Sequence, residues 1–250
     1  MRTIDLQGHV ALVTGASLGL GAAIAQTLAE AGAAVVVNYA KSASAAVAVV
    51  SGIEAAGGRA LAHQADVRSD EAVEAMFARA ARELGAIDIV VNNAGREEAV
   101  ASPFDLSRED YQEMLDLNLH AVVGACRAAL PAMQARHWGR VINIASMAVF
   151  RPVHGFSAYA SAKAAMVGLT RNLAHELGPH GVTVNAVSPG WIPVQRHADQ
   201  AEAIAQTVAA TPLGYAGSPH HVADAVLFFA SPLADFVTGA NLQVAGGHNL

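Results

Sequence analysis

Two side chains that could exchange a proton, Tyr159 and Lys163, stand four positions apart in the sequence. In a helix this spacing places both on one face, where they can converge on one point. The phenol of tyrosine has an unperturbed pKa of about 10, and a neighbouring ammonium group lowers that pKa toward neutrality. Ser146, thirteen residues upstream, adds a hydroxyl that can bond a carbonyl oxygen. Together the three residues fit proton transfer at a carbonyl or alcohol group.

A glycine-rich stretch near the N-terminus indicates a second kind of chemistry. Residues Thr14–Gly21 read TGASLGLG and follow the apolar run Val10–Val13. Glycines allow a tight turn and let a pyrophosphate approach a helix N-terminus, where free N–H groups and the helix dipole favour anions. The stretch therefore predicts a dinucleotide site. An ordinary strand-to-helix turn is the alternative, because the spacing is not the usual GxGxxG.

Short β-branched runs alternate with Ala-rich stretches of helical length, and these elements must position the polar residues. The alternation predicts an α/β fold, a Rossmann-type doubly wound parallel sheet of seven strands with helices on both faces, in one domain spanning residues 1–250. The expected strands are His9–Thr14, Ala34–Tyr39, Ala60–Ala65, Ile87–Asn92, Arg140–Ala145, Val182–Val187 and Asn241–Val244. The expected helices are Gly19–Ala31, Ser42–Ala56, Ser69–Leu84, Arg108–Arg136, Ala158–Leu177 and Pro219–Ala230. Ser69 and Ser107 are predicted helix N-caps.

Composition narrows the classes of function. Acidic residues outnumber basic ones by 21 to 15, and no basic stripe is present, so nucleic acid is not an expected partner. No apolar run approaches the about 18 residues that span a bilayer, so no membrane association is expected. The single cysteine, Cys126, cannot form an intramolecular disulfide, which predicts a cytoplasmic location. No metal is expected, because the spacing of four histidines builds no ligand set with a carboxylate: His154, His197, His220 and His221.

Several motifs in order along the whole chain resemble the short-chain dehydrogenase/reductase family in its compact single-domain form. They are the TGxxxGxG turn, Asn92-Asn93-Ala94-Gly95, Asn118, Ser146, the Tyr159-x-x-x-Lys163 pair and Ser188-Pro189-Gly190. The overall match looks most like the 3-oxoacyl-(acyl-carrier-protein) reductase-like branch. The resemblance implies hydride transfer between a nicotinamide cofactor and a carbonyl or secondary alcohol substrate, such as a 3-oxoacyl thioester.

The same resemblance implies roles for the catalytic residues. Tyr159 is the expected general acid for reduction and base for oxidation, and Ser146 orients and polarises the carbonyl. Lys163 favours the tyrosinate and holds the nicotinamide ribose, while Asn118 supports a water that links Lys163 to solvent. Without this context, the Tyr–Lys pair is typical of a solvated helix face, and Asn118 of a residue bonding its own helix backbone.

NADP is the preferred cofactor prediction, with NAD as the alternative. Enzymes that prefer NAD generally place an acid at the end of the second strand, where this sequence has Asn38 followed by Lys41 and Ser42. Leu18 lacks the positive charge that NADP-preferring relatives often carry there, and Asp66 resembles the adenine-contacting acid or, alternatively, a cap before a helix. The cofactor-binding residues implied in this way are Gly15, Ser17, Leu18, Gly19, Leu20, Asn38, Tyr39, Lys41, Ser42, Asp66, Val67, Asn93, Ala94, Gly95, Tyr159, Lys163, Pro189, Gly190 and Ile192.

Three segments resemble the family's substrate loops: Arg96–Glu98, Met147–His154 and Trp191–His197. Their mixture of aromatic and charged residues is compatible with a polar or anionic carbonyl compound, although Arg96 could equally pair with a neighbouring acid. The resemblance also implies a homo-oligomer, a tetramer or dimer, with Ala225–Ala230 and the strand around Leu242 as a contact, unless that run is a core helix.

Two other functions stay open at this stage. One is a regulator that binds a dinucleotide without turnover, which the presence of all four polar residues disfavours. The other is an NAD-dependent alcohol or polyol dehydrogenase. An epimerase or dehydratase is disfavoured, because such relatives usually carry an additional substrate domain.

Overall fold

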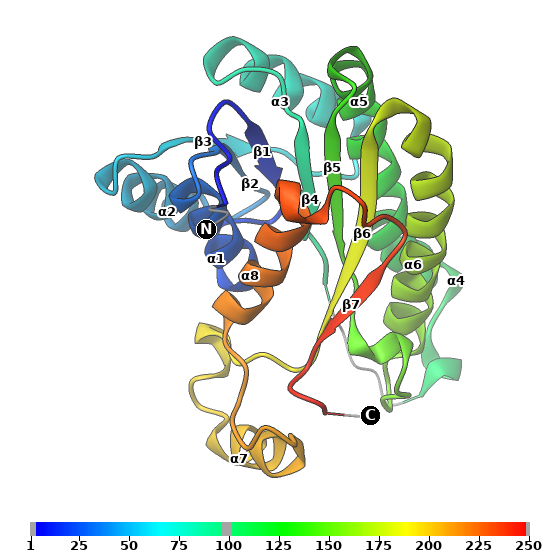
Figure 1. The fold of residues 1–250 in the computed structure, drawn as a ribbon. Helices are drawn as coiled ribbons and strands as arrows, with labels where there is room; N and C mark the ends of the chain where they lie inside the picture. The colour runs from blue at the N-terminus through cyan, green and yellow to red at the C-terminus, as the bar shows by residue number, and fades with distance from the viewer. Residues whose placement is uncertain (1–3, 97–101, 249–250) are drawn as a thin grey trace.

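The computed structural model describes residues 4–96 and 102–248, and its centre is one sheet of seven parallel strands. The strand order is β3-β2-β1-β4-β5-β6-β7, so the chain moves outward from β1 in one direction and then in the other (Figure 1). The strands are β1 (Val10–Val13), β2 (Ala34–Tyr39), β3 (Arg59–Gln64), β4 (Ile89–Asn92), β5 (Gly139–Ile144), β6 (Val182–Pro189) and β7 (Asn241–Val244). The predicted fold class is confirmed.

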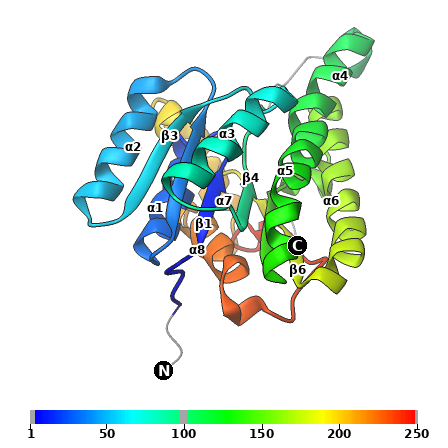
Figure 2. The ribbon, with the colours of Figure 1, turned by 90° about the horizontal axis from the view of Figure 1, so that it is seen from above.

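Helices cover both faces of the sheet. The helices are α1 (Gly19–Glu30), α2 (Ala43–Ala55), α3 (Asp70–Glu83), α4 (Arg108–Leu115), α5 (Ala121–Arg136), α6 (Ser157–Leu177), α7 (Ala201–Ala210) and α8 (Pro219–Ala230). Seen from above, α1, α2 and α8 lie on one face, while α3, α5 and α6 lie on the other (Figure 2). In the described part of the chain, no helix combines the length and hydropathy that crossing a bilayer requires.

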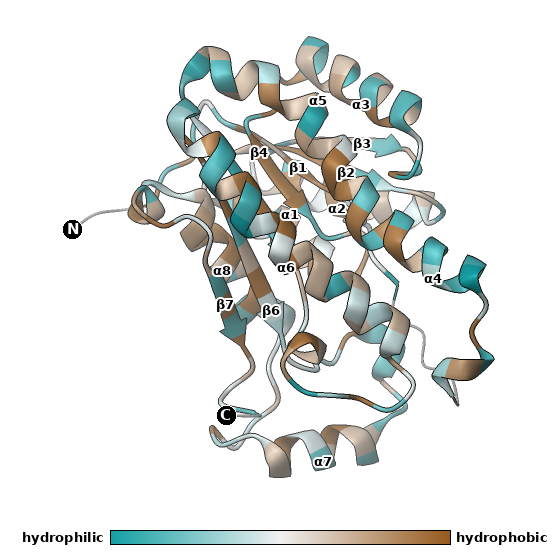
Figure 3. Ribbon diagram, turned by 90° about the vertical axis from the view of Figure 1, so that its right-hand side faces the viewer, coloured by the Kyte–Doolittle hydropathy of each residue, from teal (hydrophilic) through white to brown (hydrophobic). Residues whose placement is uncertain are grey.

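Strand β1 and most of β2 and β4 are apolar runs, because both faces of these central strands are covered. Every residue of β1, β4, β5 and β6 is buried, and β1 and β4 appear brown among helices with mixed colouring (Figure 3). Alternate side chains of one strand enter different cores: Ala11 and Val13 pack with α1 and α8, whereas Val10 and Leu12 pack with α3 and α5. A parallel sheet that is buried on both faces needs this pattern.

Most predicted elements agree with the structure to within two residues, and three differences bear on the site. The predicted helix Arg108–Arg136 is not continuous, because a π-helical turn, Asp116–His120, separates α4 from α5. Helix α7 was not predicted, and it lies beyond the carboxyl end of the sheet (Figure 1). Strand β6 continues two residues further than expected, to Pro189.

Both predicted N-caps are confirmed. Ser69 Oγ accepts the backbone N–H of Ala72 at 3.2 Å. Ser107 Oγ accepts the N–H of Asp110 at 3.1 Å, and the Asp110 carboxylate accepts the N–H of Ser107 at 2.8 Å. This reciprocal capping box satisfies two of the free N–H groups at the start of α4.

The amino-terminal edge of the sheet contains a buried acid, Asp88. Its side chain is fully buried; it accepts the backbone N–H of Val10 at 3.0 Å and lies 3.0 Å from His9 Nδ1. The guanidinium of Arg136 forms an ion pair with the same carboxylate. A buried carboxylate is tolerated here because several donors surround it.

Aromatic and charged side chains extend this arrangement. Trp138 stacks on His9, with ring centroids 4.0 Å apart, and the guanidinium of Arg140 lies 4.2 Å from the centroid of the Trp138 ring. Arg140 is itself buried and pairs with Asp235. We call this group the amino-end cluster: His9, Asp88, Arg136, Trp138, Arg140 and Asp235.

The run Ala225–Ala230 of α8 was a predicted subunit contact, with a core helix as the alternative. The structure places Val226, Phe229 and Ala230 in the core against α1, so the core interpretation of Ala225–Ala230 is correct for these residues. On the neighbouring edge strand, Leu242 is 40% exposed. The oligomeric state stays a prediction.

Candidate active site

The glycine turn after β1 is held in place by side chains from two neighbouring strands. Gly15 has a φ of +61°, a conformation that favours glycine, and its N–H donates to Asn38 Oδ1 at 3.1 Å. Asn93 Nδ2 donates to the carbonyl oxygens of Thr14 and Gly15, at 2.8 and 3.1 Å. Thr14 Oγ1 in turn accepts the N–H groups of Asn93 and Ala94, each at 2.9 Å. The turn is therefore rigid before any ligand binds.

The N-terminus of α1 opens directly from this turn. Its N-cap is Leu18, which supplies no side-chain hydrogen bond, and the first turn of the helix contains no acidic residue. The backbone N–H groups at the start of the helix are therefore not capped by a side chain of their own. With the helix dipole, they form a site suited to a phosphate or pyrophosphate.

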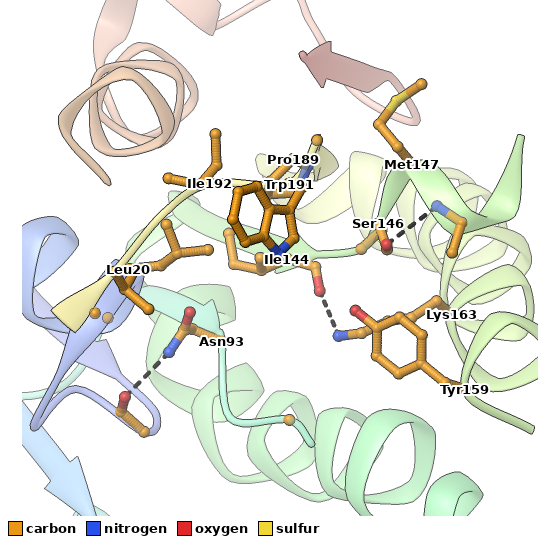
Figure 4. A pocket seen from close by; sticks show the side chains of 18 of the residues that line it. Leu20, Asn93, Ile144, Ser146, Met147, Tyr159, Lys163, Pro189, Trp191 and Ile192 are labelled. Carbon is orange, nitrogen blue, oxygen red and sulfur yellow. Dashed lines mark hydrogen bonds between the residues drawn. The ribbon is translucent and has the colours of Figure 1, made fainter. Parts of the chain in front are cut away.

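Tyr159 and Lys163 lie on one face of α6, as their spacing predicts. Lys163 Nζ is buried and donates to the backbone carbonyl of Ile144 at 2.6 Å, which fixes the ammonium at the end of β5. The same nitrogen lies 5.8 Å from the centroid of the Tyr159 ring. Figure 4 shows both side chains on one side of the cleft, with Leu20 and Asn93 across from them.

Ser146 follows β5 by two residues and lies beside Tyr159 and Lys163 (Figure 4). Its Oγ accepts the N–H of Ala148 at 3.1 Å, which caps a short helical turn, Met147–Val149. The hydroxyl proton is not used by that bond. Ser146 can therefore donate a hydrogen bond to a ligand oxygen in the cleft.

Asn118 is fully buried in the π-helical turn between α4 and α5. Its Nδ2 donates to the Met114 carbonyl at 3.0 Å, while its Oδ1 has no hydrogen-bond partner among the described residues. A Cβ added to Gly95 would lie 2.9 Å from this Oδ1 and 3.5 Å from Lys163 Nζ, so the three residues meet at one point. π-Turns of this kind occur frequently at functional sites.

A cleft of about 560 Å³ joins the glycine turn to Ser146, Tyr159 and Lys163. Pro189, Trp191 and Ile192 cover one side of it (Figure 4). Fourteen of the predicted site residues line the cleft: Gly15, Ser17, Leu18, Gly19, Leu20, Asn93, Ala94, Gly95, Ser146, Tyr159, Lys163, Pro189, Gly190 and Ile192. The carboxyl edge of the sheet, at the switch between β1 and β4, is where ligands bind in open α/β folds.

The remaining predicted residues do not line this cleft. Among them, Asn38 was predicted to bind the cofactor, and its contacts correct that prediction. Asn38 is buried, and its Nδ2 donates to the Ala65 carbonyl at 3.0 Å while its Oδ1 accepts from Gly15. Because both ends of its amide are used inside the protein, Asn38 holds the turn instead of facing a ribose. The other predicted residues outside the cleft lining are Tyr39, Lys41, Ser42, Asp66, Val67 and Asn118.

Asp66 forms hydrogen bonds with Arg68, and the N-cap of the following helix, α3, is Ser69 instead. Arg68 donates to its carboxylate through Nη2, at 2.6 Å, and through its backbone N–H, at 3.0 Å. The side-chain bonds from Arg68 hold the pKa of this exposed carboxyl below its usual range. Asp66 therefore stays ionised, and it shares its acceptor oxygens with Arg68.

The predicted substrate segments are only partly in the cleft. Residues from Met147–His154 and Trp191–His197 line it, including Arg151, Trp191 and Arg196. Arg96 pairs with Glu113, at 3.3 Å between Nη2 and Oε2, while Glu97 and Glu98 lie outside the described residues.

Three residues that the sequence interpretation did not single out also shape the site. Thr14 fixes the turn through its hydroxyl. Gly21 has no side chain, and a Cβ there would collide with Gly15 and Asn93. His248 lines the cleft from the C-terminal segment. Thr14 and Gly21 lie inside the glycine motif, so the motif could have identified them. No signal in the sequence identified His248. Within the described residues, no group of three or more His, Cys, Asp or Glu side chains is placed to hold a metal ion.

Comparison with known proteins shows the family. Residues 15–249 match the family model described as enoyl-(acyl carrier protein) reductase. The chain is 43% identical to 3beta-hydroxysteroid dehydrogenase 1 of Eggerthella lenta, over 98% of this chain and 95% of the relative. The chain belongs to the short-chain dehydrogenase/reductase family. This short-chain dehydrogenase/reductase is also 42% identical to the 3-oxoacyl-(acyl-carrier-protein) reductase of Synechocystis, over 97% of both chains.

A solved structure superimposes on nearly the whole chain. It is a blue fluorescent protein from a metagenomic library, in complex with NADPH, with a TM-score of 0.90 and 37% identity. It covers 98% of this short-chain dehydrogenase/reductase and is itself covered completely. The two chains therefore share one fold over nearly their whole lengths.

Proposed function

We propose that this short-chain dehydrogenase/reductase is an NADP-dependent reductase that converts a carbonyl compound to a secondary alcohol. The observation that carries the proposal is the single cleft in which Ser146, Tyr159 and Lys163 face the uncapped N-terminus of α1. One end of the cleft suits phosphates, and the other suits a carbonyl oxygen. A bound nicotinamide cofactor would supply the hydride, and the rest of the chemistry belongs to these side chains.

In this mechanism the substrate carbonyl oxygen accepts hydrogen bonds from Ser146 Oγ and Tyr159 Oη. Tyr159 gives its proton to that oxygen as the carbonyl carbon receives the hydride, so the product is a neutral alcohol. The phenolate left behind is stabilised by the ammonium of Lys163, whose position is fixed by the Ile144 carbonyl. The unused Oδ1 of Asn118 can hold a water between Lys163 and solvent, through which the proton is restored.

The preference for NADP over NAD rests on the end of β2. Asn38 faces into the protein but brings no acid to this end of the strand, and Lys41 and Ser42 lie between β2 and α2. Ser42 is the N-cap of α2 and makes no side-chain capping bond, and the first turn of α2 contains no acid. A lysine, a free hydroxyl and a helix N-terminus at one place favour a 2′-phosphate.

Titration of tryptophan fluorescence with NADPH and NADH tests this choice, because Trp191 lines the cleft. We expect NADPH to bind at least tenfold more tightly, about 1.4 kcal/mol. Replacing Lys41 with alanine should reduce this ratio without changing NADH binding. A preference for NADH would contradict the assignment and direct the search to alcohol and polyol oxidation.

Tyr159→Phe separates an enzyme from a dinucleotide-binding regulator. We expect the variant to bind NADPH normally and to lose about 10²- to 10⁴-fold in kcat, because it keeps the ring and loses the transferable proton. The first substrates to test are 3-oxoacyl thioesters and 3-oxosteroids, after the two named relatives. Unchanged function in Tyr159→Phe would favour the regulator.

A further inference from the structure

Three polar side chains form a buried ladder of hydrogen bonds between the sheet and α6. Asn92 Nδ2 donates to Asn143 Oδ1, and Asn143 Nδ2 donates to Thr170 Oγ1, each at 2.9 Å. Thr170 Oγ1 also donates to the carbonyl of Met166, one turn earlier in α6, at 2.8 Å. All three side chains are buried. We call Asn92, Asn143 and Thr170 the Asn–Thr ladder, which joins the ends of β4 and β5 to α6.

The Asn–Thr ladder lies beside the contact that fixes Lys163. Asn143 precedes Ile144, whose carbonyl oxygen accepts from Lys163 Nζ (Figure 4). Adjacent residues of β5 therefore hold α6 at two points, Lys163 and Thr170, which are about two helical turns apart. The second point of attachment prevents the helix from turning or sliding about the first. The position of α6 on β5 thus depends on the bond between Asn143 and Thr170.

The polarity of the ladder differs from that of the core around it. On the same face of the sheet, Val90 of β4 and both Val141 and Ala145 of β5 are apolar and belong to the core with α3, α5 and α6. Buried hydrogen bonds contribute little net stability compared with apolar groups of the same shape, because the unfolded chain makes the same bonds with water. Their directions, however, favour one arrangement of the groups that they join. The ladder therefore selects one register of α6 on β5.

The proposed reaction needs that register, because its groups come from two elements. Ser146 follows β5 and Tyr159 belongs to α6, yet both hydroxyls must bond the same carbonyl oxygen (Figure 4). Lys163 also belongs to α6, but β5 holds its ammonium, 5.8 Å from the centroid of the Tyr159 ring. A movement of α6 along β5 would therefore carry Tyr159 away from both of its partners.

We propose that Asn143 and Thr170 are positioning residues for proton transfer, because their bond holds α6, and Tyr159 with it, against the groups that β5 fixes. The inference rests on the proposed reductase function and adds two residues that lie outside the lining of the cleft. The other end of the ladder, Asn92, precedes Asn93, which braces the glycine turn. The ladder thus connects the proton-transfer end of the cleft with its phosphate end.

The ionisation of Tyr159 tests the proposal without turnover. The ultraviolet absorbance of tyrosinate is followed against pH in each protein and in the same protein carrying Tyr159→Phe, and the difference between the two curves reports Tyr159 alone. Thr170→Val keeps the shape of threonine and loses the hydroxyl. We expect the pH at which Tyr159 is half ionised to rise in this variant by about half a unit or more, because the Lys163 ammonium no longer lies where it favours the phenolate.

The conservative variant at the same position distinguishes the bond from the volume of the side chain. Thr170→Ser keeps a hydroxyl that can accept from Asn143, so Tyr159 should ionise as in the wild-type protein. An unchanged Tyr159 titration in Thr170→Val would overturn the proposal.

Asn143→Ala removes the same bond from the strand side, and it serves as the second variant if Thr170→Val does not fold. We expect its shift to have the same direction, and the double variant to shift no further than the larger single shift, because one bond can be lost only once. Thr211→Val is the matched control, since buried Thr211 also donates to the carbonyl four residues earlier, at 2.7 Å, but lies outside the ladder. It should leave the titration unchanged. Additive shifts would indicate general loosening and reject the proposal.

Steady-state kinetics connects the ladder with the reaction. In folded Thr170→Val we expect kcat for carbonyl reduction to fall by about tenfold or more, with a smaller change in the KM for NADPH, because the phosphates are expected at α1 and not at α6. If the wild-type protein reduces no carbonyl compound but Tyr159 titrates in the pattern above, the proposed reductase function fails and the positioning role stands. A fall in kcat that only matches the loss of folded protein, with a normal Tyr159 titration, rejects the positioning role.

Discussion

At the amino-terminal edge of the sheet, the fully buried Asp88 accepts from Val10 and lies against His9 and Arg136. At the carboxyl-terminal edge, the equally buried Asn118 leaves its Oδ1 without a described partner, and the N-terminus of α1 has no side-chain cap. Both edges are polar, but the first satisfies a buried charge internally and the second leaves donors and acceptors available. The residues at the amino edge therefore stabilise the fold, whereas those at the carboxyl edge act on a ligand. Residues of the second kind often lower the stability of the protein.

The largest effect is expected from adding one methyl group at the carboxyl edge. In Gly21→Ala the new Cβ would lie 2.5 Å from Asn93 Nδ2 and even closer to the Gly15 carbonyl oxygen, so the turn must move. We expect NADPH binding to weaken by about 100-fold or more, measured by fluorescence titration. Gly168→Ala on α6 is the control, because its Cβ meets no atom within 4 Å. It should leave binding unchanged and raise stability by up to about 1 kcal/mol.

A substitution at the amino edge should lower the stability of the protein and leave NADPH binding unchanged. Asp88→Ala leaves the buried N–H of Val10 and the ring of His9 without their acceptor, so we expect the free energy of unfolding to fall by about 3 kcal/mol. Urea denaturation measures this change, while NADPH affinity of the folded variant should stay the same. Asp70→Ala removes an exposed pair with Arg127 and should cost less than about 1 kcal/mol. A loss of affinity in Asp88→Ala at unchanged stability would contradict the division between the edges.

Asn118 sharpens the comparison, because its removal should affect activity more than stability. Asn118→Ala deletes an amide whose Oδ1 is buried and unpaired, so the free energy of unfolding should change by less than about 1 kcal/mol. We expect kcat to fall about tenfold, with the loss depending on pH, because the proton path to Lys163 is interrupted. Asn172→Ala is matched, since exposed Asn172 also donates to the carbonyl four residues earlier. That variant should keep full activity.

The smallest effect is expected at Cys126. Burial raises the pKa of this thiol to about 12, so almost none of it is the reactive thiolate at pH 8. A colorimetric disulfide reagent should therefore label the protein only after unfolding in urea. Fast labelling of the folded protein at pH 8 would show that the core around α5 opens more readily than its packing indicates.

The sequence was sufficient to predict the fold and to name fourteen residues that line one cleft, for physical reasons that differ between residues. The central strands β1, β2 and β4 are mostly apolar runs, and Tyr159 and Lys163 share a helix face through their spacing alone. Asn38 was misplaced because a strand-end position does not tell which way its amide points. The break at Asn118 was missed, since a π-turn needs only one extra residue in an otherwise helical pattern. His248 meets Arg151 from 97 positions away, and no local pattern encodes that contact.

The contacts between Thr14 and the loop after β4 also constrain the order in which the molecule assembles. They join residues 79 and 80 positions apart, so an entire α/β half-domain must be closed into a loop before they form. A chain that has formed only β1, β2 and β3 contains the glycine turn and its bond to Asn38 but lacks Asn93, which braces the turn from the end of β4. A dinucleotide would therefore act late, by retaining the finished sheet and slowing its unfolding, and would offer little help to a nascent or half-folded chain.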